Sequence, residues 1–296
     1  MHYDEQVYRP PQEAYTPLLQ VTSGCSYNKC TYCNMYEGVP FRVSPIEEIE
    51  KDLQELQSYQ RNLERIYLVN GDPFVLSMKK LKTICELIHK YLPSIKTISM
   101  YASVKNISSK SLEELKILRE LGLNEIYIGL ESGSNKVLKA VNKGSTAEDA
   151  LRELSKLEEA GIEYYPIIMT GLGGRGNAIE TALETATLFN KLNPRGVFCA
   201  STIVMPRTKL YEQKLNGEFT EASEYERVIE LKTLIENINA NRDIILSSNH
   251  YSNNLLLNGV LPRDKEYLLK KCTDILENYT EEEFQKKHNR GSLNRM

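Results

Sequence analysis

The chain repeats one pattern of hydrophobic and polar positions. A short run of β-branched or aromatic residues is followed by a longer, charge-rich stretch with apolar residues three and four apart. Runs of the first kind predict strands, and stretches of the second kind predict amphipathic helices. The predicted strands cover residues 18–23, 65–71, 97–103, 125–132, 164–171 and 197–205. We therefore expect a chain built from six strand-helix units.

The order of these units predicts the fold class. Strands that alternate with helices form right-handed parallel βαβ units, whose loops after the strands gather at one face. Six units indicate an α/β fold of the partial (β/α)6 TIM-type barrel class. Beyond residue 205 the pattern is mainly helical, with 222–239 and 264–279 as the clearest helices. We expect residues 1–215 to form the partial barrel and residues 216–296 to form a helical C-terminal cap within the same domain.

Charge and hydropathy narrow the choice of partner. Lys and Arg total 37 against 40 Asp and Glu, so no broad basic face indicates an intact nucleic acid as partner. The first residues lack the apolar core of a signal peptide, and no apolar run approaches the ~18 residues of a membrane-spanning helix. We expect a cytoplasmic protein that acts on a small molecule and not on a membrane. In such a reducing compartment, six cysteines are expected to bind metal, act in catalysis or be buried.

Three cysteines follow the first predicted strand closely. Cys25, Cys30 and Cys33 are spaced C-x4-C-x2-C, and thiolates on so short a loop can converge on a soft metal centre. A structural zinc site needs four ligands, and the other three cysteines stand alone in predicted helices or strands. Three unmetallated loop thiols would be open to oxidation without any packing benefit. The spacing fits best a 4Fe-4S cluster whose fourth iron is open to a small ligand.

The GCSYNKCTYC loop resembles that of the radical S-adenosylmethionine (SAM) enzymes. That family has C-x3-C-x2-C after its first strand, with an aromatic residue before the last cysteine, and Tyr32 takes that place here. The first spacer is one residue longer, which makes the loop bulge and leaves three thiolates available. The resemblance covers about residues 15 to 215 and is closest to the branches of the oxygen-independent coproporphyrinogen oxidases and the methylthiotransferases. It implies one 4Fe-4S cluster whose open iron is chelated by SAM.

Further stretches that resemble family motifs stand at the ends of later predicted strands. NGDP resembles the stretch that receives the methionyl ammonium of SAM, and because Asp72 is shorter than the family's Glu, we expect a backbone contact there. Glu131 in GLESGS stands where the family uses a carboxylate for the ribose hydroxyls or the amine. IIMTGLGGRG and VMPRTKLY resemble the stretches that border the adenine. The resemblance implies SAM contacts from Tyr32, Asn70, Gly71, Asp72, Pro73, Ser103, Glu131, Met169, Arg175 and Met205.

Each of these stretches also has a plain structural interpretation. NGDP is typical of a β-turn, GLES of a strand that runs into a loop, and GLGGRG of a flexible connection or a phosphate nest. Their joint occurrence at the same end of successive strands, behind a three-cysteine loop, favours the functional interpretation.

The resemblance also implies the chemistry. A reduced cluster delivers an electron from a donor such as flavodoxin or ferredoxin, and SAM yields a 5′-deoxyadenosyl radical. No protein side chain is predicted to be catalytic, because the radical derives from SAM. We predict that Arg207, His250, Asn253 and Arg263 bind the substrate. A polar loop between helices, together with surface ion pairs, explains these four residues equally well.

The identity of the substrate stays open at this point. Beyond residue 205 the sequence contains neither a further cysteine cluster nor an RNA-binding module, which favours a small metabolite. Short radical SAM proteins of anaerobes with this loop are similar to queuine lyase, which implies a nucleotide substrate, queuosine 5′-phosphate, and release of queuine. A decarboxylase similar to coproporphyrinogen III oxidase, and a haem or iron-sulfur carrier without catalysis, are the alternatives.

Overall fold

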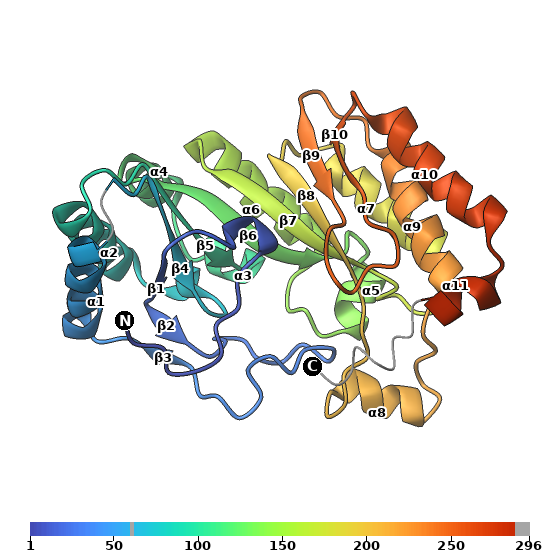
Figure 1. The fold of residues 1–296 in the computed structure, drawn as a ribbon, viewed down its shortest axis with the longest axis horizontal. Coiled ribbons are helices and arrows are strands. Elements are labelled where there is room, and N and C mark those ends of the chain that lie inside the picture. Colours follow the sequence, from blue (N-terminus) through green and yellow to red (C-terminus); the bar gives the residue numbers. More distant parts are fainter. Residues whose placement is uncertain (60–61, 288–296) are drawn as a thin grey trace. The chain divides into compact units, whose positions relative to one another are not determined.

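The computed structural model describes residues 1–59 and 62–287 (Figure 1). The chain divides into two compact units. The first contains Met1–Asn28, Met35–Gly129 and Arg152–Tyr164, and the second contains Lys29–Asn34, Leu130–Leu151 and the chain from Tyr165 onward. This division differs from the boundary at residue 215 that we expected, and the assignment of the whole chain to one domain stays a prediction.

The first unit is built on parallel strands with helices between them. The strand order is β1 (Leu18–Gln20), β4 (Arg65–Val69), β5 (Thr97–Ala102) and β6 (Leu123–Glu131), and each neighbouring pair is parallel. A separate antiparallel pair joins β2 (Thr22–Ser23) to β3 (Arg42–Val43). The helices and 3-10 turns are η1 (Pro11–Glu13), α1 (Ile46–Tyr59), η2 (Pro73–Val75), α2 (Met78–Tyr91), α3 (Val104–Ile107), α4 (Leu112–Glu120) and the larger part of α6 (Ala147–Ala160), from Arg152 onward.

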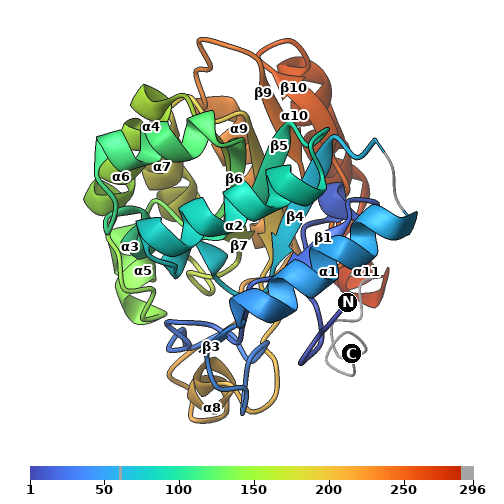
Figure 2. The same cartoon turned by 90° about the vertical axis from the view of Figure 1, so that its left-hand side faces the viewer.

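Burial along these strands explains the hydrophobic runs in the sequence. In β4, Ile66 to Val69 are all buried, as expected for a parallel strand that is covered on both faces. Figure 2 shows α1 and α2 side by side, and their apolar faces include Leu53 and Ile84, both buried. The loops that follow β1, β4 and β5 carry the predicted cluster and methionyl motifs.

The second unit is a mixed sheet covered by helices. Strands β7 (Glu163–Thr170), β8 (Gly196–Ser201) and β9 (Ile244–Ser247) are parallel, and β10 (Asn258–Leu261) is antiparallel to β9. The helices are α5 (Asn135–Ala140), α7 (Ala178–Phe189), α8 (Lys209–Leu215), α9 (Glu224–Asn237), α10 (Lys265–Asn278) and α11 (Glu281–Lys287). Helix α9 packs between α7 and α10 (Figure 1). This helix faces the loop that follows β7.

All six predicted strands and both predicted C-terminal helices have counterparts. The predicted strand 18–23 is divided into β1 and β2, which belong to different sheets, and β8 ends at Ser201 rather than at residue 205. Two strands beyond residue 205 were not predicted, so the mainly helical C-terminal part that we expected also contains strands. Strands β9 and β10 have four residues each, IILS and NGVL, and flank a polar, Asn-rich segment. Runs this short carry little periodicity, and their pairing with β8 and with each other supplies what the local pattern lacks.

None of the helices in the described residues has the length and apolar character needed to cross a membrane. The cytoplasmic location of the protein stays a prediction.

Candidate active site

The six cysteines fall into two classes by burial. Cys25, Cys30 and Cys33 are partly exposed, whereas the other three are buried. Burial raises the pKa of each buried thiol to about 12, so these remain protonated and inert near neutral pH. Only a thiolate binds a metal well. The loop cysteines are therefore the available metal ligands, and the inert three are Cys85, Cys199 and Cys272.

In the first unit, the backbone before Cys25 is tightly constrained. Gly24 has a φ of +68°, and a Cβ on it would lie 2.9 Å from the Pro40 carbonyl oxygen, so only glycine fits. The Gly24 N–H donates to Glu5 Oε1 at 2.6 Å. On the other side, the Asn28 N–H donates to the Cys25 sulfur at 3.4 Å. These contacts fix the direction of the Cys25 side chain.

In the second unit, the segment with the other two cysteines is held by neighbouring backbone. The Cys33 N–H donates to the Cys30 carbonyl at 3.3 Å, which makes a tight turn between the two thiols. Thr31 lies in this turn, where its N–H donates to Val141 O at 3.0 Å and its carbonyl accepts from Leu210 N–H at 2.8 Å. The ends of α5 and α8 therefore position this part of the loop.

A buried charge pair lies beside these two cysteines. Lys143 Nζ and Glu131 Oε1 are 2.7 Å apart, and their side chains are 12% and 8% exposed. Burial lowers the pKa of Lys143, but Glu131 and then Cys30 and Cys33 raise it more, so the lysine stays charged. Burial, followed by Glu131, raises the pKa of Tyr32 well above its ordinary value. Lys143 was not among the residues predicted from the sequence.

The predicted methionyl motif lies in the first unit at the end of β4. Asn70 is fully buried with a φ of +80°, and its Nδ2 donates to Thr22 O at 3.2 Å. A Cβ on Gly71 would lie 2.7 Å from Gly24 O and 3.0 Å from Cys25 Cα, so the two turns touch backbone to backbone. Pro73 opens η2 directly after this motif. The motif thus lies against the start of the cysteine loop.

The Asp72 carboxylate serves as a structural anchor. Its Oδ2 accepts from Ser103 Oγ at 3.1 Å, from Ser26 Oγ at 3.3 Å and from Asn106 Nδ2. Asp72 is 2% exposed. Oδ2 is thus engaged by three donors within the protein, and the SAM contact with the backbone here stays a prediction. Ser26 and Asn106 were not predicted, because nothing in their local sequence indicates this partner.

The predicted adenine stretches lie in the second unit. Met169 and Tyr32 pack against a buried cluster of Val137, Val141 and Leu172. Arg175 is exposed, and its N–H donates to Thr220 O at 2.9 Å. The last predicted contact in this unit is Met205, whose carbonyl accepts from Thr208 N–H at 3.3 Å in the turn before α8.

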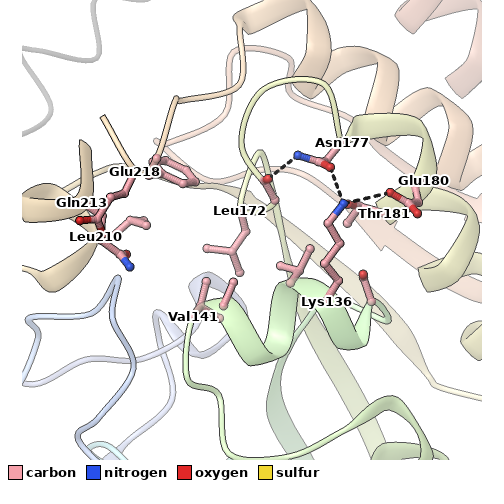
Figure 3. Close-up of a pocket in the computed structure, with 14 residues that line it drawn as sticks. Lys136, Val141, Leu172, Asn177, Glu180, Thr181, Leu210, Gln213 and Glu218 are labelled. Atoms are coloured by element: carbon pink, nitrogen blue, oxygen red, sulfur yellow. Dashed lines mark hydrogen bonds and ion pairs between the residues drawn. The ribbon is translucent and has the colours of Figure 1, made fainter. Parts of the chain in front are cut away.

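A cavity of about 130 Å³ is lined in part by the same apolar cluster (Figure 3). Val141 and Leu172 form part of its wall. At its rim, Lys136 Nζ donates to Asn177 Oδ1 at 3.0 Å and lies 3.4 Å from Glu180 Oε2. The apolar cluster against which Tyr32 and Met169 pack therefore also contributes to this cavity.

The four predicted substrate residues have different surroundings. Arg207 is exposed, with a φ of +68°. His250 and Asn253 share one turn between β9 and β10, where burial lowers the pKa of His250 and Asn253 Nδ2 donates to Cys199 O and Ser248 O. Arg263 lies beyond β10, where it is exposed and donates two hydrogen bonds to the Asp264 carboxylate. The segment expected to join two helices joins two strands, and substrate binding by these residues stays a prediction.

The described residues do not contain three or more His, Cys, Asp or Glu side chains gathered as a metal site. The assignment of a cluster therefore depends on the spacing of the three cysteines and on the partial exposure of their thiols. Soft sulfur donors on a short loop, with a lysine held charged beside two of them, fit an iron-sulfur cluster. The residues present are thus compatible with the predicted group.

The sequence profile of the radical SAM superfamily matches residues 19–189, more than half of the chain. The chain belongs to the radical SAM superfamily. A 4Fe-4S cluster and SAM are the cofactors of this superfamily, as predicted from the three cysteines. The family and cofactor predictions are confirmed, and the individual site residues stay predictions.

Known proteins similar to this chain include several radical SAM proteins. The heme chaperone HemW of Bacillus subtilis is 26% identical over 196 residues, which cover 64% of this chain and 51% of HemW. This chain spans about half the length of the curated HemW relatives that it matches. These relatives therefore do not establish the activity of the whole protein.

Solved structures confirm the fold class. The radical SAM methyltransferase TsrM from Kitasatospora setae superimposes with a TM-score of 0.55 at 19% identity, covering 67% of this chain and 39% of TsrM. Coproporphyrinogen III oxidase (HemN) from Escherichia coli gives a TM-score of 0.54 at 16% identity, covering 75% of this chain and 52% of HemN. At such identities the likeness shows the α/β partial-barrel fold alone.

Proposed function

We propose that the protein is an enzyme that binds SAM at a 4Fe-4S cluster held by Cys25, Cys30 and Cys33. Bound there, SAM would supply a radical able to take hydrogen from a small substrate. The observation that carries the proposal is the contrast among the cysteines, since the three in the loop are accessible and the three elsewhere are buried thiols. Three protein ligands leave one iron of the cluster open to SAM.

The residues around the loop have complementary roles in this proposal. When bound, the cluster supplies the electron that breaks the sulfonium bond of SAM. Lys143 offsets the negative charge of the Cys30 and Cys33 thiolates and of Glu131, which lowers the cost of burying them. Glu131, which Lys143 holds in place, is the proposed carboxylate for a ribose hydroxyl or the amine of SAM. The backbone of Asn70 and Gly71 offers carbonyls to the methionyl ammonium.

We infer further that the substrate is a small molecule and propose queuosine 5′-phosphate as the first one to test. The GCSYNKCTYC loop supports this choice, as does the presence of only one cysteine, Cys272, beyond residue 205. The reaction would be that of a lyase that releases queuine after hydrogen abstraction from the ribose. Arg207, which follows β8 and is exposed, is the proposed contact to the phosphate. A flavodoxin or a ferredoxin would supply the electron.

The similarity to the heme chaperone HemW and to coproporphyrinogen III oxidase supports a second candidate. Under it, the protein would bind a tetrapyrrole, either as an oxidase that removes carboxylates from a porphyrinogen or as a carrier of haem. A carrier would hold the cluster or haem and would produce no 5′-deoxyadenosine.

One experiment separates these candidates. The protein is reconstituted with iron and sulfide without air, reduced with dithionite and given SAM, and 5′-deoxyadenosine is quantified by chromatography. Queuosine 5′-phosphate and coproporphyrinogen III are added in separate arms. We expect queuosine 5′-phosphate to raise the yield and to release queuine. Loss of carboxylates in the other arm would favour the oxidase, and haem binding without 5′-deoxyadenosine would favour the carrier.

Matched cysteine variants test the cluster ligands. Replacing Cys25, Cys30 or Cys33 with Ala should remove the cluster absorbance and the 5′-deoxyadenosine. Replacing the buried Cys85 with Ala is the control, which should keep both because that side chain lies in the core. Loss of the cluster in the control alone would place the metal elsewhere.

A further inference from the structure

Helix α9 places a buried cation at the ends of two parallel strands. The side chain of Arg227 is 1% exposed. Its Nη1 donates to Thr170 O at 3.1 Å and to Thr202 O at 3.0 Å. These carbonyls belong to the last residue of β7 and to the first residue after β8, and Thr202 N–H also donates to Thr170 O at 2.9 Å. Arg227 therefore ties together the ends of both strands.

Two carboxylates on the same helix hold the loop that follows β7. Glu230 Oε2 accepts from Gly171 N–H at 2.7 Å, and Glu226 Oε1 accepts from Gly176 N–H at 2.5 Å. The three side chains are close together on the helix surface, because position 230 lies four residues after 226 and three residues after 227. One face of α9 thus fixes the loop at both ends.

The loop sequence is matched to this helix. Gly171 has a φ of +76°, and a Cβ on it would overlap the guanidinium of Arg227. Two independent features therefore require glycine at this position, namely the positive φ angle and the close approach of the Arg227 guanidinium. A loop with any other residue at this position could not close against α9 in this way.

Folding alone does not require buried charges at these positions. Burying an arginine and a carboxylate costs desolvation free energy, and apolar residues of similar volume are often equally stabilising or more so. What the charges provide is a defined backbone position for Thr170, Gly171 and Gly176. The residue before them, Met169, packs with Tyr32 on the apolar cluster described above.

We propose that Arg227 and Glu230 are positioning residues that hold the loop after β7 in the shape that receives the nucleoside part of SAM. This inference rests on the proposed function, because it takes the stretch from Met169 to Arg175 as the border of the adenine. Neither residue touches the reacting atoms. They act through the backbone between Thr170 and Gly176.

The test compares SAM affinity with cluster content and folding. Arg227→Lys keeps the charge and reaches only one of the two carbonyls. Glu230→Gln replaces the carboxyl group that accepts from Gly171 N–H with an amide group. We expect both variants to bind iron as the unmodified protein does, because the cysteine loop has other supports. Their dissociation constants for SAM should rise at least about tenfold. At saturating SAM the rate of 5′-deoxyadenosine formation should stay within about twofold of the rate of the unmodified protein. This combination would show that the variants lose affinity for SAM and keep the chemical step.

Two glycine variants provide a matched pair. Gly171→Ala introduces a Cβ against Arg227, whereas Gly217→Ala introduces one at a similar φ, +77°, with nothing within 4 Å. Both variants carry the same kind of backbone strain. We expect only Gly171→Ala to weaken SAM binding. If Arg227→Lys does not fold, Glu226→Gln tests the other end of the loop and should weaken binding as well.

The outcomes separate this inference from the proposed function. If the unmodified, cluster-loaded protein does not bind SAM, the proposed function is wrong. If it binds SAM and the folded Arg227→Lys, Glu230→Gln and Gly171→Ala variants bind it equally well, the positioning role is overturned. Equal weakening by Gly217→Ala and Gly171→Ala would assign the effect to strain and would also overturn it.

Discussion

Asp72 is the single residue on which the predicted methionyl motif depends most. Its carboxylate joins Ser26 to Ser103 and Asn106, and this pair lies in a segment far from Ser26 in the sequence. Hydrogen bonds to a charged acceptor are stronger than those between neutral groups. Removing the acceptor leaves buried donors without a partner, so the cost exceeds that of an ordinary surface change.

We expect Asp72→Ala to lower the free energy of unfolding by about 2–4 kcal/mol. Urea denaturation of the cluster-free protein measures this change. Asp274→Ala is the control, because it removes only an exposed ion pair with Lys270 and should cost less than about 0.5 kcal/mol. Equal stability of the two variants would show that Asp72 is not an anchor.

Glu230 should make stability depend on pH. Burial raises its pKa to about 8, although the Gly171 N–H and Arg227 oppose the rise. Because the folded chain holds this proton more tightly than the unfolded chain, stability should fall as the pH rises from about 4.5 through about 8. Glu230→Gln should remove that part of the slope. Denaturation midpoints across this range measure it, and unchanged slopes in the variant would contradict the assignment.

The sequence singles out the loop cysteines and Glu131 as candidates, but it does not reveal the charged residues that contact or lie beside them. Lys143 lies 12 residues after its partner Glu131, and no local pattern connects the two. Arg227 and Glu230 have the spacing of a solvated helix face, yet they are buried. The local sequence around a buried, paired charged residue can look the same as that around an exposed one. Only the fold therefore shows which of the two a charged residue is.

At the scale of elements, turns between strands and helices position the predicted site. The turn after β4 places Gly71 in close contact with the backbone of Gly24 and Cys25. This contact follows from two consecutive parallel strands, β1 and β4, that end at the same edge. The sequence predicted these strands because their runs are apolar, and it missed β9 and β10 because pairing, not local pattern, forms them.

We expect Gly71→Ala to separate the two turns and to reduce the iron bound per chain after reconstitution. A Cβ there would meet backbone atoms, which cannot move aside as a flexible side chain can. Gly38→Ala is the control, since a Cβ at Gly38 meets nothing within 4 Å. Iron and sulfide analysis measures the result. Full iron content in Gly71→Ala would mean that this close approach does not support the cluster.

At the scale of the whole chain, the repeated strand-helix units allowed the fold class to be predicted before the structure. The order of parallel strands brings loops that are far apart in sequence to corresponding strand ends. The family could be predicted because three cysteines and several weak motifs occur in a fixed order along these units. The substrate could not, because its contacts depend on side chains whose partners are set by folding, such as Asn253 with Cys199 O.

The measurement that tests the central claim most directly is electron-nuclear double resonance of the reduced, reconstituted protein with SAM labelled by ¹⁵N at its amino group. If three cysteines hold the cluster and SAM takes the open iron, the spectrum should show coupling between the cluster and the labelled nitrogen. A cluster with no such coupling, or a purified protein that holds zinc in place of iron, would contradict the account.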